Sequence, residues 1–411
     1  MIIRIILLSL VLVSDCLALD LDDQIALIKK VYQLQPKNCD ISDSSEQAKI
    51  NAGRELFESK ILSGNQDISC RNCHLDQFGS ADGLPIAVGV GGEGEGKKRY
   101  QKGGVLVQRN ALSLKGRGHP RFRAFFWDGK AQQDGQRIVT QFGDHVTGFD
   151  SPLAAAAILP LVERDEFLGE TSYLVSNDIQ AEVGDKVYYD RYIAVGKGIR
   201  DRIRNSRDSS AQTLREKLSV AGIKLQEMEL VDIGNLLAQF IADEFRCEES
   251  FWDRYLEGDL NALTPQQKKG AVLFFGKGRC ASCHDGELFS DFEYHSIGTP
   301  QGGYGVHSRH RDIGRAGVTN RAEDLYRFRT PPLIGVRETA PYGHNGAFST
   351  LEEVVNHHYN PMAFYMDHRD YYSADYYRIG KLMGSRDKLL ATMDLKSRDE
   401  IAKIVAFLKA L

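Results

Sequence analysis

The sequence predicts a mainly helical fold made of two related units, and three observations support this prediction. The pattern Cys-x-x-Cys-His occurs twice, at residues 70–74 and 280–284. Similar segments precede the two copies, Gly-Arg-Glu-Leu-Phe at 53–57 and Gly-Ala-Val-Leu-Phe at 270–274. The alternation of apolar and polar residues that marks strands is scarce in the rest of the chain. A repeated pattern with a repeated flank indicates two units of similar structure.

Each copy of the pattern has the spacing that attaches a c-type haem. On a helix, positions i, i+3 and i+4 share one face, so two thiols can bond the porphyrin while the imidazole reaches the iron. A zinc site would have to unite cysteine pairs far apart in the chain, and a thiol redox pair needs a βαβ context that neither copy shows. We therefore predict two covalently bound c-type haems. The attachment residues are Cys70, Cys73 and His74 for the first and Cys280, Cys283 and His284 for the second.

The N-terminus predicts export. Arg4 precedes an apolar stretch at residues 5–13 that is too short to span a bilayer and is typical of a secretory signal. We expect a signal peptide over residues 1–18, a periplasmic location, and no membrane span in the mature chain. A lipoprotein anchored at Cys16 is the alternative, although the acidic residue before it fits that signal poorly.

Composition and cysteine count narrow the other possibilities. A net charge of −4 argues against a nucleic-acid-binding surface. Of the 7 cysteines, Cys39 and Cys247 remain once Cys16 and the haem thiols are set aside. They can pair in an oxidising compartment. The alternative is two separate buried thiols, because sequence does not show whether their Cα atoms come close.

The helices expected between and after the two patterns set the domain organisation. We place the domains at residues 46–225 and 226–411, and we expect an amphipathic helix at 231–246 to close the first unit. Thr264 and Pro265 predict the start of a helix before the second pattern. A capping box at 397–400 predicts a terminal packing helix, which is open to packing back on the first domain.

Two kinds of segment carry no chemical prediction. The glycine-rich stretches at 89–96 and 302–305 lack the strand-then-helix context of a dinucleotide site, so we expect loops. Residues 170–222 show no interpretable motif and are either packing elements or a partner surface.

Beyond the haem patterns, the chain resembles the bacterial di-haem cytochrome c peroxidases and their relative MauG, the tryptophylquinone-forming enzyme. The resemblance covers about residues 46–411. It implies two cytochrome c-like helical domains facing each other, with a peroxide-binding first haem and an electron-transferring second haem. The shared segments are Arg109-Asn110, Phe126-Trp127-Asp128-Gly129, Arg327 to Arg329 with Thr330-Pro331, Thr339-Ala340-Pro341-Tyr342, His344-Asn345-Gly346 and Thr350-Leu351-Glu352-Glu353.

The resemblance implies that His74 and His284 are the proximal iron ligands. Peroxide binds only where the sixth position of the iron is open. Classical members of the family carry a displaceable histidine after the first pattern, whereas the matching position here is Val90. We therefore expect a permanently five-coordinate first haem, as in MauG. His119 and His145 are the alternatives if the alignment shifts.

Two catalytic roles also follow from the resemblance. The family uses a glutamate to move a proton between the peroxide oxygens, and Glu166 is the nearest match. Glu163 and Asp165 are its rivals. Trp127 matches a tryptophan that relays electrons between the haems, and the alternative is an ordinary core aromatic residue.

The sixth ligand of the second haem is expected at His358, which gives a bis-histidine haem with a lower reduction potential than a His/Met centre. Neighbouring candidates are His357, Tyr359, Met362 and Met366. His344 is expected to line the haem pocket, whereas His307 and His310 are expected in solvated loops.

A calcium ion between the domains is implied by the match of Asn110, Thr339 and Pro341 to positions that offer it one side-chain and two backbone oxygens. Ordinary turn residues would look the same in sequence.

The function expected from the sequence is a periplasmic di-haem peroxidase. It would reduce hydrogen peroxide to water with electrons from a small donor protein, a cytochrome c or a cupredoxin. Two alternatives remain, a MauG-like oxidase that modifies a partner protein and a non-enzymatic di-haem electron carrier. Whether the chain forms a homodimer is left open.

Overall fold

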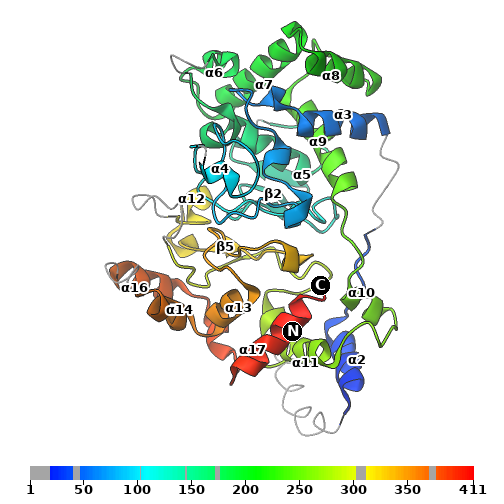
Figure 1. Ribbon diagram of the computed structural model, residues 1–411, viewed down its shortest axis with the longest axis vertical. Coiled ribbons are helices and arrows are strands. Elements are labelled where there is room, and N and C mark those ends of the chain that lie inside the picture. Colours follow the sequence, from blue (N-terminus) through cyan, green and yellow to red (C-terminus); the bar gives the residue numbers. More distant parts are fainter. Residues whose placement is uncertain are drawn as a thin grey trace.

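The computed structural model describes residues 19–39, 47–101, 103–143, 146–171, 176–301, 312–369 and 376–411. Its elements form two groups, one above the other in Figure 1, and the predicted mainly helical fold is confirmed. The expected signal peptide, the glycine-rich stretch at 302–305, His145, His307 and His310 lie outside the described residues.

Each group is built on a pair of crossed helices, and the repeated sequence explains the crossing. In the first unit α3 (Gln47–Glu58) packs on α9 (Leu230–Glu244), and in the second α11 (Pro265–Phe275) packs on α17 (Arg398–Leu408). The repeated glycine sits where the helices touch. A Cβ at Gly53 would lie 2.1 Å from a backbone oxygen of α9, and one at Gly270 would lie 2.0 Å from a backbone oxygen of α17. Only glycine allows so close an approach.

The phenylalanine of each repeat completes the same contact. The ring of Phe57 lies 5.1 Å from that of Phe240, and the ring of Phe274 lies 5.3 Å from that of Phe407. All four side chains are almost fully buried. The repeat is therefore a packing motif that holds the helix before each Cys-x-x-Cys-His pattern.

The rest of the first unit surrounds α3 and α9. Helix α5 packs on α9, α7 packs on α6 and α8, and α8 packs on α3. Strands β1, β2 and β3 form an antiparallel sheet in that order. The bounds are α4 (Lys98–Gln101), β1 (Ala124–Phe125), β2 (Ala131–Asp134), β3 (Arg137–Thr140), α5 (Pro152–Ile158), α6 (Asp178–Val183), α7 (Tyr188–Asn205) and α8 (Ser209–Val220). Helices α6 to α8 thus occupy the stretch that carried no motif.

The second unit contains α13 (Leu351–Tyr359) against α17, and the short antiparallel pair β4 and β5. The predicted start of α11 is confirmed, because the side chain of Thr264 accepts a hydrogen bond from Gln267 N. At α17, Ser397 accepts from Glu400 N as predicted, but the Glu400 carboxylate accepts from Lys396 N instead of closing the box. The other elements are α10 (Phe251–Leu256), β4 (Tyr294–His295), α12 (Ala316–Thr319), β5 (Phe328–Arg329), α14 (Pro361–Asp367) and α16 (Tyr376–Ser385).

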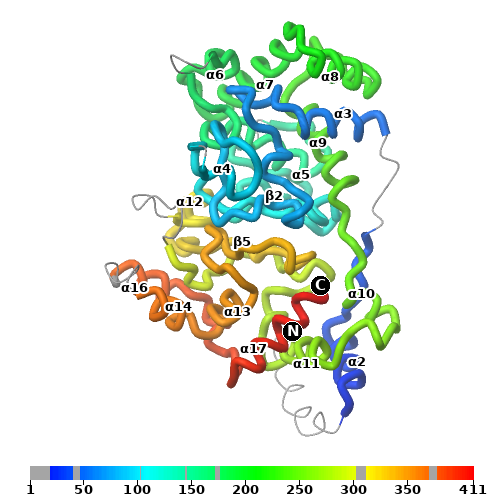
Figure 2. Tube along the Cα trace, in the orientation of Figure 1, coloured from blue at the N-terminus to red at the C-terminus, as the bar shows by residue number. Residues whose placement is uncertain are grey.

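The units differ from the expected domains in three respects. Helix α9 belongs to the first core, as expected of the helix at 231–246, but the change between units therefore comes after Cys247 and not at 225/226. Helix α17 packs within its own unit instead of back on the first. Helix α2 (Leu21–Tyr32), which was not predicted, packs on α11 in the second unit, as Figure 2 shows.

A disulfide joins Cys39 to Cys247, with their Cα atoms 5.3 Å apart. It ties the segment after α2 to the end of the first core, where the chain passes between the units. Of the two alternatives left open by the sequence, the structure has the paired one. Within the described residues, no helix combines the length and the apolarity needed to cross a bilayer.

Candidate functional site

Each Cys-x-x-Cys-His pattern forms one tight turn of 3-10 helix in place of a regular helix. In the first copy, Cys73 N and His74 N both lie 3.1 Å from the carbonyl oxygen of Cys70. The second copy, at 280–284, has the same two bonds at 3.2 and 2.9 Å. A turn closed at both i+3 and i+4 still presents the two thiols and the imidazole together.

Both histidines are oriented through one ring nitrogen. His74 Nδ1 lies 2.8 Å from Ser80 O, and His284 Nδ1 lies 3.0 Å from Phe289 O. A nitrogen that donates to a carbonyl carries the proton, which leaves Nε2 free to bind a metal. Burial lowers the pKa of both imidazoles to about 4, so both are neutral at physiological pH. Two neutral, oriented imidazoles fit the role of haem ligands.

The thiols do not fit the other two interpretations. Burial raises the pKa of Cys70, Cys73 and Cys280 to about 12, whereas a redox-active cysteine needs a lowered pKa. The cysteines of the first pattern also pack on the first core and Cys280 on the second. The four thiols therefore do not form one zinc site.

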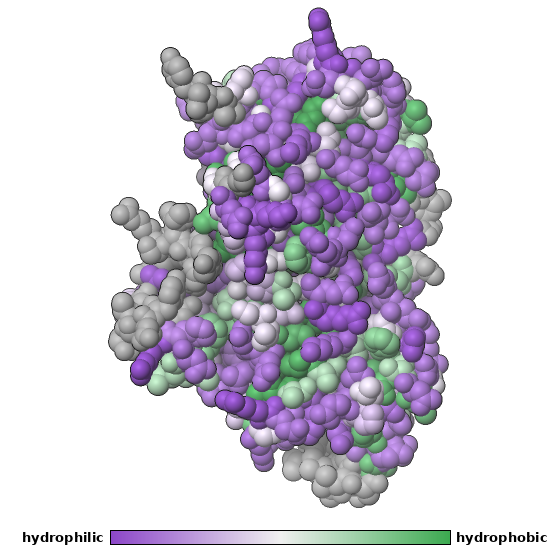
Figure 3. Space-filling model, in the orientation of Figure 1, coloured by the Kyte–Doolittle hydropathy of each residue, from purple (hydrophilic) through white to green (hydrophobic). Residues whose placement is uncertain are grey.

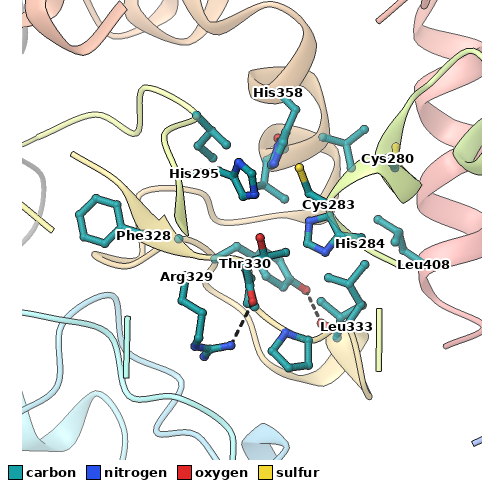
Figure 4. A pocket seen from close by; sticks show the side chains of 18 of the residues that line it. Cys280, Cys283, His284, His295, Phe328, Arg329, Thr330, Leu333, His358 and Leu408 are labelled. Carbon is teal, nitrogen blue, oxygen red and sulfur yellow. Dashed lines mark hydrogen bonds between the residues drawn. The ribbon is translucent and has the colours of Figure 1, made fainter. Parts of the chain in front are cut away.

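In the second unit, His284 faces His358 across a cavity with mainly apolar walls (Figure 4). The two ring centroids are 6.5 Å apart. A metal with both Nε2 atoms at about 2.0 Å would place the centroids roughly 6.3 Å apart. His358 Nδ1 lies 2.7 Å from Val354 O, which orients its Nε2 as in the other histidines. Figure 3 shows apolar side chains gathered over the same unit.

The rival ligands near His358 lie elsewhere. His357 is fully buried, and its Nε2 lies 3.2 Å from Gly298 O. Tyr359, Met362 and Met366 are 40, 45 and 64 % exposed. Among the described residues of this stretch, His358 is the one that lines the cavity between α13 and His284.

In the first unit, the loop with Val90 lies directly against the segment that carries Glu166. Val90 N donates to Asp165 O at 3.2 Å, and a Cβ at Gly89 would lie 1.8 Å from that oxygen. Val88 O lies 3.8 Å from Cys73 Sγ, so the loop also borders the haem attachment turn. Two residues that the sequence separates by 76 positions, 90 and 166, are thereby brought to one site beside the first pattern.

The environment of Glu166 differs from that of its rivals. Burial raises the pKa of Glu166, and the Lys130 ammonium partly opposes this effect. Asp165 is exposed, and the Glu163 carboxylate accepts a hydrogen bond from Gln141 at 3.1 Å. A raised pKa is expected of a carboxyl group that exchanges protons during a reaction, which supports Glu166 among the three acids.

His119, an alternative ligand for the first haem, does not point towards the Val90 loop. Its Nε2 lies 3.6 Å from the Glu287 carboxylate of the second unit, and its Nδ1 accepts from Arg121 N at 3.2 Å. Both ring nitrogens therefore have partners away from the Val90 loop.

Trp127 lies at the junction of the units. It is 8 % exposed and lines the cavity of the second site. Its Nε1 donates to Asn110 O at 3.2 Å, and its carbonyl oxygen accepts from Arg329 N at 2.8 Å. Its side chain is thus held from the first unit and its backbone from the second.

An ion cluster that sequence reasoning missed fixes the same junction. The Arg109 guanidinium contacts Asp128 at 2.6 Å and Asp312 of the second unit at 2.7 Å. His344 stacks on Phe328 with ring centroids 3.7 Å apart and lines the cavity, as expected. Asp312 has no sequence signal, because its role depends on a contact across the units.

The three residues matched to a calcium site line one wall of the cavity. Asn110 Nδ2 donates to Leu84 O at 2.7 Å, which leaves Oδ1 available. Within the part of the chain that the structure describes, no hydrogen bond reaches this Oδ1 or the carbonyl oxygens of Thr339 and Pro341. Unpaired hard oxygens fit a calcium ion.

A second group of potential metal ligands consists of Cys283, Asp291 and His295, whose ligand atoms all lie within 4.8 Å of one another. His295 contacts Asp291 at 2.9 Å and Asp387 at 2.7 Å. Hydrogen bonding to Asp291 raises the pKa of His295 to about 11. A protonated imidazole has no free lone pair, and Cys283 belongs to the haem pattern, so this cluster fits an ion pair better than a metal site.

The comparisons with known proteins agree with this geometry. The di-haem cytochrome c peroxidase family matches residues 47–261. The cytochrome-c peroxidase IdrP2 of Denitromonas iodatirespirans is 26% identical over 389 residues, covering 88% of this chain and 81% of the relative. MauG, the methylamine utilization protein of Methylorubrum extorquens, is 26% identical over 317 residues, with coverages of 75% and 68%. The diheme peroxidase BthA of Burkholderia thailandensis has the same fold, with a TM-score of 0.62 at 20% identity, covering 92% of this chain and 89% of that one.

Proposed function

Because the chain belongs to the di-haem cytochrome c peroxidase family, we propose that it reduces hydrogen peroxide to water in the periplasm. Two protons and two electrons convert one peroxide into two waters. The electrons come one at a time from a small redox protein, a cytochrome c or a cupredoxin. The observation that carries the proposal is the difference between the two sites, because a buried valine borders the first and a histidine faces the second.

The haem-binding residues follow from the two turns. Cys70 and Cys73 would hold the first haem and His74 would ligate its iron, while the pattern at 280–284 would do the same for the second. When bound, the haems supply the redox chemistry. His358 would supply the second histidine ligand of the haem bound at 280–284, whereas the Val90 side chain has no group that can ligate a metal and would leave room for peroxide at the first site.

Glu166 moves the proton. Its carboxylate would take a proton from one peroxide oxygen and return it to the oxygen that leaves as water. The raised pKa suits this exchange, because a carboxyl that titrates closer to neutral pH both accepts and releases a proton readily. The Lys130 ammonium lowers the pKa of Glu166 and so opposes part of the effect of burial.

Trp127 carries electrons between the two sites, since it lines the second cavity and is anchored by hydrogen bonds to both units. Asn110, Thr339 and Pro341 would hold a calcium ion through one side-chain and two backbone oxygens. The ion, if bound there, would join one loop of the first unit to one loop of the second.

A MauG-like oxidase that acts on a partner protein is the second candidate. Val90 favours it, because a first site without a displaceable histidine needs no prior reduction. His358 weighs against it, because MauG carries tyrosine at the matching position. A non-enzymatic electron carrier would need both irons closed.

The test is steady-state peroxide consumption by the haem-loaded protein with reduced cytochrome c as donor. We expect two equivalents of donor to be oxidised per peroxide. No consumption by protein with both haems present would reject the peroxidase. Peroxide reactivity without donor turnover would favour the MauG-like candidate.

A further inference from the structure

Two arginines, Arg117 and Arg329, are buried without a carboxylate partner among the described residues. They are 7 and 1 % exposed. Arg329 donates from Nε to Phe126 O at 2.9 Å and from Nη1 to Thr330 O at 3.0 Å, a bond drawn in Figure 4, while its buried Nη2 has no partner. Arg117 donates from Nε to Ser113 O at 2.6 Å, and no described acceptor takes a hydrogen bond from its Nη atoms.

Both guanidinium groups line the cavity that His284 and His358 share. They lie on the same aromatic ring, since the central carbon of Arg117 is 5.5 Å and that of Arg329 is 5.6 Å from the ring centre of Phe122. Burial lowers the pKa of Arg117 to about 9 and that of Arg329 to about 10. Two buried like charges are costly unless an anion pairs with them.

The missing anion has to enter the cavity with whatever fills it. The walls are mainly apolar, and the neighbouring cation Lys115 already contacts the Glu338 carboxylate at 2.8 Å. A haem matches this arrangement because it is an apolar ring with two carboxylates on one edge. Guanidinium groups bind carboxylates in parallel hydrogen-bonded pairs.

We propose that Arg117 and Arg329 bind the propionate carboxylates of the haem attached at Cys280 and Cys283. The proposal rests on the second haem site described above, but not on peroxide turnover. It turns the propionate edge towards Trp127, because Arg329 N donates to the carbonyl oxygen of Trp127 at 2.8 Å.

This pairing has an electrostatic consequence. Two guanidinium groups beside the propionates favour the reduced iron, which carries one positive charge less. They therefore raise the reduction potential of the second haem. They also keep the propionates ionised, so the potential changes little with pH.

The experiment compares the full-length, haem-loaded protein with Arg117→Gln, Arg329→Gln and Arg329→Lys. Arg123→Gln is the matched control, because Arg123 lies on the same loop but its side chain is 51% exposed and pairs with Glu293. The measurements are haem content per chain, the propionate bending band in the resonance Raman spectrum, and the potential of each haem between about pH 5 and 8.

We expect both glutamine variants to move the propionate Raman band and to lower the reduction potential of the second haem. This potential should also become more dependent on pH. Lysine at 329 should restore part of the shift, and the control should match the parent protein. Unchanged band and potential in fully loaded variants would overturn the proposal, as would a shift confined to the other haem. If Arg329→Gln fails to load haem, Arg117→Gln decides, because the Arg117 side chain makes a single hydrogen bond within the described chain. If the protein did not reduce peroxide, the haem content, the Raman band and the potentials could still be measured. Failure of the proposed function is therefore distinguishable from failure of this proposal.

Discussion

The two haem sites are alike on the side of the attachment pattern and differ on the opposite side. In both, a Gly-x-x-x-Phe helix packs on a partner helix, and a half-buried histidine is held through Nδ1 by a carbonyl, at 2.8 Å in the first and 3.0 Å in the second. Opposite His284 stands His358, whereas the loop beside the first turn offers Val90. The repeat therefore provides two similar ways to hold a haem, and the non-repeated loops decide which one can react.

The largest expected effect comes from the acid of the first site. Glu166→Gln should lower kcat/KM for peroxide by about 10²–10⁴-fold, because the proton can no longer be moved between the oxygens. Asp165→Asn is the matched control, because Asp165 is adjacent but exposed. Steady-state kinetics with reduced cytochrome c measures both. Equal losses in the two variants would remove the special role of Glu166.

The pH profile of the same reaction sharpens this assignment. Because burial raises the pKa of Glu166 above 4.5, its carboxylate is lost as the pH falls towards that raised value. We expect kcat/KM to decrease on the acid side with an apparent pKa above 4.5, and the decrease to vanish in Glu166→Gln. An acid limb that is the same in both proteins would assign it to another group.

Val90→His should make the first site resemble the second. An imidazole at this position is expected to occupy the sixth position of the first iron, converting it to low spin and removing most of the peroxide turnover of the oxidised protein. Val90→Leu is the control of similar size without a ligand. Optical and electron paramagnetic resonance spectra report the spin state. A high-spin first haem in the histidine variant would mean that the loop does not lie over the iron.

His358→Met should change the second site alone. A thioether in place of an imidazole is expected to raise the potential of the low-spin haem while leaving the first haem high-spin. Tyr359→Phe serves as the control, because Tyr359 is adjacent and 40% exposed. Spectroelectrochemical titration gives both potentials. An unchanged potential in the methionine variant would mean that a neighbouring residue, and not His358, is the ligand.

The smallest expected effect concerns the stability of the fold. It should not change the difference between the two haem sites. Replacing Cys39 and Cys247 together by alanine should lower the free energy of unfolding by about 2–5 kcal/mol, because the closed loop is long. Denaturant unfolding followed by circular dichroism measures it, with the spectra of both haems unchanged. A parent protein that is equally stable with and without reductant would contradict the stabilising role.

Sequence alone predicted the parts of the molecule that depend on local patterns. The start of α11 at Thr264 and the terminal helix follow from capping, which neighbouring residues determine. The Cys-x-x-Cys-His patterns were expected on helices, and the structure has short 3-10 turns there instead. His358 was also expected opposite His284. The sequence could not distinguish it from His357, whereas in the structure His358 lines the cavity and His357 does not.

The parts that sequence did not predict depend on contacts between distant segments. Nothing local in residues 21–32 shows that α2 packs on α11, or that Asp312 meets Arg109 across the units. The burial of Arg117 likewise appears only once distant segments are packed together.

Electron paramagnetic resonance of the oxidised, fully haem-loaded protein tests the difference between the two sites most directly. One high-spin signal and one low-spin bis-histidine signal are predicted, and His358→Ala should alter the low-spin signal alone. Two low-spin signals in the unmodified protein would contradict an open first haem.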